Sequence, residues 1–291
     1  MATTSGVIAI LMWGLLAVLS VYSASFPPFQ LLFVCFAVSS IIVIIKRYSK
    51  REQVWRLPNL TVQQWLFATG GLFGFHFCYF MAVRFAPPIE ASLIAYLWPL
   101  MLGVAVATRS QRHFAVVGGL VGFVGCGVLV TGGKTIAFNS DYILGYAFAL
   151  SCAFIWTGYS WFMSQTESQV EDIGWISGVV ALLALAAHVG LEESHWQFSW
   201  QDWLSAILLG LGPVGGAFYL WDIGLKFGNK ALLASLSFAT PVISSLALYL
   251  CGLSVLTNDI TVALGLIVSG ALISNALPSV WARYKLRYHQ I

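Results

Sequence analysis

Long apolar runs alternate with short polar connections along almost all of this 291-residue chain. The runs reach the roughly 20 residues that a helix needs to cross about 30 Å of hydrocarbon. The pattern therefore predicts about ten membrane-spanning helices. We expect these helices at residues 6–24, 28–45, 63–84, 89–108, 114–132, 143–163, 174–190, 203–225, 231–251 and 260–282.

Composition supports the same class of protein. Hydrophobic residues make up 59% of the chain, charged residues make up 9%, and the mean hydropathy is +0.85. In an ordinary soluble domain about a quarter of the residues are charged. The expected fold is an all-α integral membrane protein embedded in a lipid bilayer. The net charge of +3 comes from cations that flank apolar runs, so we expect no nucleic-acid partner.

The positions of Lys and Arg predict the orientation. With a cytoplasmic N-terminus, all 14 cations except Arg84 and Lys134 lie on the cytoplasmic side, as the positive-inside rule requires. Arg283, Lys285 and Arg287 then place the C-terminus in the cytoplasm too. We predict a multi-pass protein of the inner (plasma) membrane. No Lys or Arg precedes the first apolar run, so we expect a helix there and not a cleaved signal peptide.

Two uncharged stretches, each centred on a proline, align without a gap. The separation that relates Pro99 to Pro241 also relates several flanking residues. This repeat predicts a chain made of two halves. On that alignment Tyr79, Arg84, Phe85 and Tyr96 correspond to Trp221, Lys226, Phe227 and Phe238.

The expected halves cover residues 1–134 and 141–291. Trp13 in the first helix of one half corresponds to Trp156 in the first helix of the other, at a separation one residue larger. Each half holds five helices, and because five is odd, the second half must cross the membrane in the opposite sense. We therefore expect an inverted pair of repeats around a central cavity.

The matched prolines indicate where a solute would bind. A proline inside a helix lacks the N–H that would bond the carbonyl four residues earlier, which frees the carbonyls of Ala95 and Ser237. We expect these carbonyls to face each other near the middle of the membrane, where they would accept hydrogen bonds from an ammonium group. The alternative is that both prolines merely kink their helices and that neighbouring hydroxyls satisfy the carbonyls.

These features resemble the EamA branch of the drug/metabolite transporter superfamily. The resemblance covers nearly the whole chain and rests on two inverted five-helix halves, each with a Trp in its first helix and a proline in its fourth. The runs Glu90–Pro99 and Phe238–Ser245 are similar, more narrowly, to those of the aromatic amino acid exporters of that branch. The resemblance implies an inner-membrane exporter of aromatic and other neutral amino acids that works by alternating access.

Polar aromatic side chains inside helices form the rest of the candidate site. A phenol or indole at that depth needs a polar partner, and His76 shares a helix face with Tyr79. The alternative for each of these residues is core packing, and for His76 a neutral, hydrogen-bonded packing role. The residues that we expect to bind substrate are His76, Tyr79, Ala95, Tyr96, Trp98, Pro99, Trp156, Ser237, Phe238, Pro241 and Ser244.

Absences narrow the mechanism that the sequence predicts. No Asp or Glu occupies the middle of an expected helix; Glu90 and Asp222 lie near helix ends, and Asp222 is one turn from Lys226, with which it can pair. We therefore expect a facilitator and not a proton-coupled antiporter. A transporter of nucleotide sugars, drugs or phosphorylated metabolites remains the alternative, although phosphates would require deep cations.

No pattern of residues indicates an enzyme or a metal site. The five cysteines lack C-x-x-C spacing, and no nucleophile–base pair is visible, so we expect no catalytic residue, cofactor or metal.

Ten helices can enclose a cavity in one chain, which favours a monomer. Small residues at four-residue spacing in 114–132 and 260–282 predict that these two helices pack closely, and we assign the same packing role to Gly70, Gly74, Gly212 and Gly216.

Overall fold

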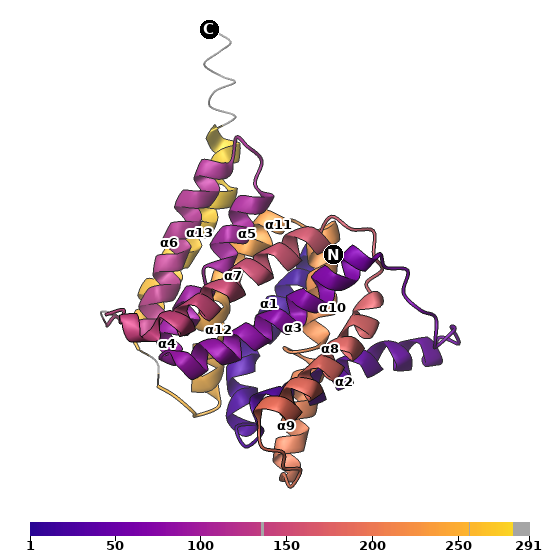
Figure 1. Cartoon of the computed structure of the whole chain (residues 1–291). Coiled ribbons are helices and arrows are strands. Elements are labelled where there is room, and N and C mark those ends of the chain that lie inside the picture. The colour runs from indigo at the N-terminus through magenta and orange to yellow at the C-terminus, as the bar shows by residue number, and fades with distance from the viewer. Residues whose placement is uncertain (135–136, 256, 282–291) are drawn as a thin grey trace.

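The computed structural model describes residues 1–134, 137–255 and 257–281 (Figure 1). Within these ranges the chain forms helices and no strands. The elements are α1 (Ala2–Tyr22), α2 (Pro28–Ser49), α3 (Val62–Phe85), α4 (Pro88–Ala95), α5 (Trp98–Val106), α6 (Arg112–Thr131), η1 (Ser140–Tyr142), α7 (Ile143–Met163), α8 (Asp172–Leu191), α9 (Trp200–Leu211), α10 (Gly216–Phe227), α11 (Lys230–Leu236), η2 (Ser237–Ala239), α12 (Thr240–Leu250) and α13 (Asp259–Asn275).

Among the described residues, nine stretches are long and apolar enough to cross a membrane, and α13 is a shorter apolar helix. Four of the nine stretches contain more than one helical element: α4 with α5, η1 with α7, α9 with α10, and α11 with η2 and α12. The predicted all-α membrane protein of about ten spans is therefore confirmed. Residue 282, the expected end of the last helix, and Arg283, Lys285 and Arg287 lie outside the described residues.

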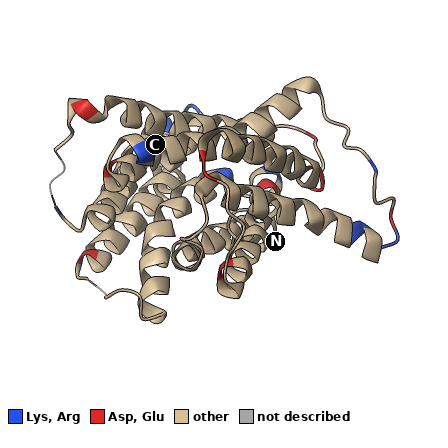
Figure 2. Cartoon of the chain, turned by 60° about the horizontal axis from the view of Figure 1, so that its bottom comes forward, with Lys and Arg blue, Asp and Glu red and all other residues tan. Residues whose placement is uncertain are grey.

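Charged side chains lie mainly at helix ends and in the connections. Figure 2 shows long uncharged stretches of helix between these positions. This distribution fits a bilayer surround, because a charge near the bilayer centre is costly. Large apolar side chains such as Leu66, Ile143 and Leu182 are correspondingly exposed on the outer surface of the helices, where lipid would cover them.

Every helix of the first half of the chain packs against a helix of the second half. α1 contacts α10, α2 contacts α8, α3 contacts α7, α5 contacts α11, and α6 contacts α13. The largest group of buried side chains lies between these pairs and draws on both halves, from Ala9 and Phe36 to Trp221 and Leu233. The core of the molecule is thus the interface between its two halves.

Small residues bring α6 and α13 together, as the sequence predicts. A Cβ added to Gly270 would lie 2.8 Å from the backbone nitrogen of Gly122, and one added to Gly125 would lie 2.9 Å from the carbonyl oxygen of Ala263. Larger side chains at these positions would force the helices apart. Figure 1 shows α6 and α13 side by side.

Candidate functional site

Both proline helices are interrupted. α4 ends at Ala95 and α5 begins at Trp98, with Pro99 in its first turn. In the second half, α11 ends at Leu236, a short 3₁₀ turn follows, and α12 begins with Pro241 in its first turn. Proline fits these places because the N–H groups of a first helical turn have no partner within the helix. Each predicted kink is therefore a boundary between two α-helices, and the few residues in between keep near-helical backbone angles.

The two interrupted spans lie next to each other. α5 packs against α11, and a Cβ added to Gly103 would lie 3.8 Å from the Cβ of Ala234, an ordinary contact distance. Close packing at small residues brings the two backbones together near their breaks.

A third interruption divides the span that the sequence predicts as one helix over 203–225, and that prediction is wrong. α9 ends at Leu211 and α10 begins at Gly216. Pro213 cannot donate to the helix, and glycines flank it on both sides. The carbonyl of Pro213 accepts a hydrogen bond from the indole N–H of Trp13 at 3.1 Å. The cluster of Gly and Pro was the available signal for this break.

Four tryptophans from four helices meet beside these breaks, and we call them the tryptophan cluster: Trp13 of α1, Trp98 of α5, Trp156 of α7 and Trp221 of α10. The ring centroid of Trp13 lies 5.0 Å from that of Trp221, 5.8 Å from that of Trp156 and 6.3 Å from that of Trp98. The Trp98 and Trp156 centroids are 6.1 Å apart. Most of these contacts are edge-to-face, a favoured arrangement of aromatic rings.

The indole N–H groups of the tryptophan cluster differ in their partners. Trp221 donates to the hydroxyl of Ser160 at 3.2 Å, and Trp13 donates to the backbone carbonyl described above. Within the described part of the chain, the N–H groups of Trp98 and Trp156 have no acceptor, although the side chains are only 8% and 3% exposed. Neither nitrogen is sealed off, because Gln30 Oε1 is the only fully buried side-chain N or O atom without a partner among the described residues. Two donors are therefore available at the centre of the protein.

His76 lies one ring away from the tryptophan cluster. Its Nδ1 bonds the backbone carbonyl of Leu72 at 2.7 Å, which makes Nδ1 the donor and leaves Nε2 as an acceptor in the neutral ring. Its imidazole contacts Phe75, whose ring in turn lies 5.2 Å from that of Trp156. The ring of Phe75 thus contacts both His76 and Trp156.

The two candidate tyrosines lie in different places. The hydroxyl of Tyr79 hydrogen-bonds that of Ser92 at 3.0 Å, which links α3 to α4. Tyr96 packs with Phe238 in a separate group of apolar side chains on the side of α6 and α13. Of the predicted site residues, Tyr96 and Phe238 therefore belong to this second group and not to the tryptophan cluster.

The second proline break is internally satisfied. The carbonyl of Ser237 accepts hydrogen bonds from both the hydroxyl and the N–H of Thr240, the former at 2.9 Å. The Ser237 hydroxyl donates to Leu233, and that of Ser244 donates to the carbonyl of Gly14 at 2.9 Å. The freed carbonyl is bonded to a neighbouring hydroxyl in this conformation, which is the alternative that the sequence left open.

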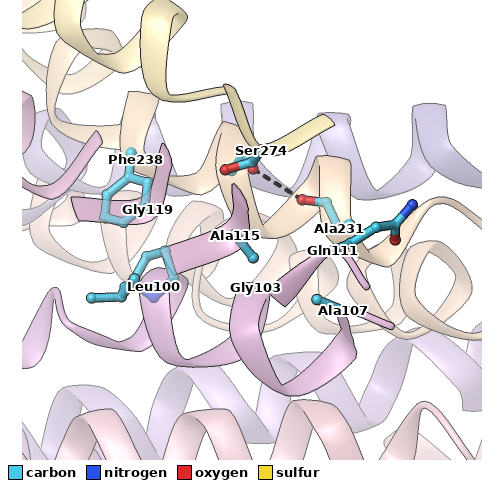
Figure 3. Close-up of a pocket in the computed structure, with 11 residues that line it drawn as sticks. Leu100, Gly103, Ala107, Gln111, Ala115, Gly119, Ala231, Phe238 and Ser274 are labelled. Carbon is cyan, nitrogen blue, oxygen red and sulfur yellow. Dashed lines mark hydrogen bonds between the residues drawn. The ribbon is translucent and has the colours of Figure 1, made fainter. Parts of the chain in front are cut away.

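A small cavity of about 20 Å³ lies at the first break. Pro99 and Phe238 both contribute to its wall, and in Figure 3 it extends from Phe238 and Leu100 towards Gln111. This volume is little more than the roughly 10–15 Å³ that one water molecule requires. The cavity is a gap between α5, α6, α11, η2 and α13, too small for an amino acid.

Polar contacts also lie near the ends of the helices. At one end, the carboxylate of Glu192 accepts the N–H groups of Phe29 and Gln30 at the start of α2, at 2.8 and 3.2 Å, and pairs with His188. At the other end, Lys226 pairs with Asp222 at 2.8 Å, as the sequence predicts.

No group of three or more His, Cys, Asp or Glu side chains within the described ranges lies close enough to hold a metal ion. The cysteines there are free thiols. The polar chemistry at the centre is therefore that of indole, imidazole and hydroxyl groups.

Comparison with known proteins adds a family. Residues 143–276 match the model of the EamA-like transporter family. A protein of Ancylobacter novellus named aromatic amino acid exporter YddG is 37% identical over 95% of this chain and 97% of its own length. A protein of the same name from Salmonella typhimurium is 24% identical over 84% of this chain and 86% of its own length. A solved crystal structure of a protein at 35% identity covers 96% of this chain and 98% of its own, with a TM-score of 0.87.

Proposed function

The chain belongs to the EamA-like transporter family of membrane transporters, and we propose that it exports aromatic and other neutral amino acids. The observation that carries this proposal is the pair of unpaired indole donors, Trp98 and Trp156, inside an aromatic cluster. A substrate carboxylate would accept hydrogen bonds from both N–H groups, while an aromatic side chain would pack against the surrounding rings. The name of the Ancylobacter novellus relative supports the same substrate class.

We propose that transport proceeds by alternating access. The rings of the tryptophan cluster contact one another, so a solute the size of tryptophan enters only when they separate. The pairing of each first-half helix with a second-half helix supports two inverted repeats, 1–134 and 141–291, that rock about their shared interface. The breaks at Pro99, Pro213 and Pro241 supply places where this motion requires little bending of intact helix.

We propose uncoupled transport. Proton coupling would require a titratable carboxylate beside the substrate, and the tryptophan cluster contains none. The buried carboxylate of Asp222 is held in its ion pair with Lys226 near the end of α10. A neutral solute moving down its own gradient fits this arrangement.

The test is exchange of radiolabelled tryptophan and threonine in proteoliposomes, with glutamate and glucose 6-phosphate as charged solutes. Trp98→Phe and Trp156→Phe keep an aromatic ring but remove the N–H. Loss of one hydrogen bond to a carboxylate should raise the half-saturating tryptophan concentration roughly tenfold or more. Trp161→Phe is the matched control, because Trp161 is an exposed residue of the same helix, α7.

Two results would contradict the proposal. Unchanged half-saturation in both Trp98→Phe and Trp156→Phe would exclude the indole donors as substrate contacts. Steady uphill accumulation of tryptophan under an imposed pH gradient would exclude uncoupled transport.

A further inference from the structure

A polar cavity of about 100 Å³ lies between the end of α2, the connection that follows it and the start of α8. The positive-inside pattern predicts that this end of the protein faces the cytoplasm. This volume is several times what one water molecule requires. Its wall is formed by Arg47, Arg56, Leu57, Asn59, Glu167, Ser168, Gln169 and Asp172.

Arg47 is a buried cation with an unused donor. The residue is 2% exposed; its Nε donates to Glu171 at 2.9 Å and its Nη1 donates to the carbonyl of Arg56 at 2.8 Å. A hydrogen bond from Lys46, with a second from Arg47, lowers the pKa of the Glu171 carboxyl, so this anion fixes the guanidinium in place. Nη2 of Arg47 has no acceptor among the described residues.

Asp172 is a buried carboxylate outside the ion pairs of the described residues, although Lys226, Arg47 and Arg56 lie near enough to act on its charge. It is 4% exposed, its Oδ2 accepts the backbone N–H of Gln169 at 2.9 Å, and its Oδ1 has no donor in the described part of the chain. The nearby Lys226 pairs with Asp222 instead and donates its other hydrogen bonds to Ser168. Asp172 forms no ion pair with any described residue.

Arg47 and Asp172 thus face one cavity, each with an unused polar atom, and they are not paired with each other. Burying a charge is costly unless it is paired and hydrogen-bonded. A zwitterion offers one group to each: a carboxylate for Arg47 Nη2 and an ammonium for Asp172 Oδ1. Arg56 and Glu167 at the rim carry the same two signs of charge.

We propose that this cavity is a vestibule that binds the α-carboxylate and α-ammonium groups of an amino acid before the solute reaches the tryptophan cluster. The proposal rests on the proposed export of amino acids. The cavity has room for several water molecules and therefore for the charged end of an amino acid, and Leu57 offers the side chain an apolar contact. The vestibule would select for the zwitterion, while the tryptophan cluster would select for the side chain.

The test compares the two faces of the membrane. Tryptophan flux is measured in sealed vesicles of known orientation, with substrate added to the cytoplasmic or to the external face of wild type, Asp172→Asn and Arg56→Gln. We expect Asp172→Asn to raise the half-saturating concentration about tenfold on the cytoplasmic face only, since one charge-assisted bond is lost. Arg56→Gln should act in the same direction, and maximal flux should stay within about twofold of wild type.

Glu52→Gln is the matched control, because Glu52 is an exposed charge on the same connection that does not line the cavity. Tryptamine, which lacks the carboxylate, and indole-3-propionate, which lacks the ammonium, should compete weakly from the cytoplasmic face. Each variant is also assayed in vesicles with and without phosphatidylethanolamine. The headgroup of this lipid carries one anionic and one cationic group, as an amino acid does, and could occupy the same cavity.

The outcomes separate the two proposals. A wild type that carries neither tryptophan nor threonine overturns the proposed function and the vestibule with it. A wild type that carries them while Asp172→Asn and Arg56→Gln leave the cytoplasmic half-saturation unchanged, or raise it equally on both faces, overturns the vestibule alone. A wild-type flux that requires phosphatidylethanolamine, with that requirement lost in Asp172→Asn, assigns the cavity to lipid and also overturns the vestibule. If Asp172→Asn yields no folded protein, Arg56→Gln decides.

Discussion

The helix α3 and the pair α9–α10 align with each other in sequence, yet their structures differ. The separation between Pro99 and Pro241 also places Gly70 on Gly212 and Gly74 on Gly216. Nevertheless α3 is a continuous helix of 24 residues, whereas α9 and α10 are two helices of 12 residues each. The same small residues therefore occur in a continuous helix in one half of the chain and at a break in the other.

One aligned pair accounts for the difference: Gly71 in α3 corresponds to Pro213. At Gly71 the missing Cβ makes room for the ring of Tyr159, to which an added Cβ would come within 2.5 Å. At Pro213 the missing N–H ends the helix. The carbonyl of Leu209, four residues earlier, accepts the N–H of Val214 instead, and the carbonyl of Pro213 itself accepts the indole N–H of Trp13. Glycine in a membrane helix thus permits close packing, and a proline among glycines converts the same segment into a joint.

The largest effect that would test this comparison comes from Gly216→Ala set against Gly74→Ala. A Cβ at Gly216 would overlap the carbonyl oxygen of Leu211, which is backbone and cannot rotate away, whereas one at Gly74 would sit 3.6 Å from Ile155 in ordinary contact. We expect Gly216→Ala to lower the free energy of unfolding by about 3 kcal/mol and Gly74→Ala to raise it by up to about 1 kcal/mol. Unfolding in denaturing detergent measures both, and equal effects would refute the distinction.

The second test concerns the hydrogen bond that fixes the break. Trp13→Phe leaves the buried carbonyl of Pro213 without its donor, which should cost about 1–2 kcal/mol. Trp156→Phe removes a similar volume from the same cluster but no hydrogen bond, so it should cost less. The same unfolding assay compares the two variants, and a Trp156→Phe variant that is the less stable of the two would contradict the assignment.

The smallest effect distinguishes the starts of the two segments. Thr61 begins α3 and Ser199 begins α9, each with its hydroxyl accepting a backbone N–H at 3.2 Å in a capping box. Thr61→Ala and Ser199→Ala should each cost about 1 kcal/mol. Amide hydrogen exchange should rise only in the first turn of α3 but along the whole of the shorter α9. Identical exchange patterns would show that the break does not isolate α9.

Much of the architecture could be predicted from sequence because a bilayer imposes a strong rule: apolar runs of one length become helices. The breaks at Pro99 and Pro241 were predictable as well, because a proline in the middle of a span removes a backbone hydrogen bond and interrupts the helix. Pro213 gives the same signal, but the glycines around it also fit close packing of a continuous helix, and that is what we predicted.

The site was predictable only in part. Depth in a helix singled out Trp98 and Trp156, but Trp221 and Phe218 join them through the packing of α10 on α1, which no local pattern encodes. Whether an indole donor or a carbonyl is already bonded depends on neighbours distant in sequence. The carbonyl of Ser237 is bonded by Thr240, whereas the indole N–H of Trp98 has no acceptor among the described residues. Only the folded structure shows this difference.

The glycine contact between α6 and α13 has a consequence for biogenesis. The ribosome completes α6 long before it begins α13, and everything between Thr131 and Asp259 must be synthesised first. At about 5–20 residues per second this takes on the order of ten seconds. During that interval the glycine-lined face of α6 meets lipid or the insertion machinery, so the newly made chain is most vulnerable to wrong helix partners before its last span arrives.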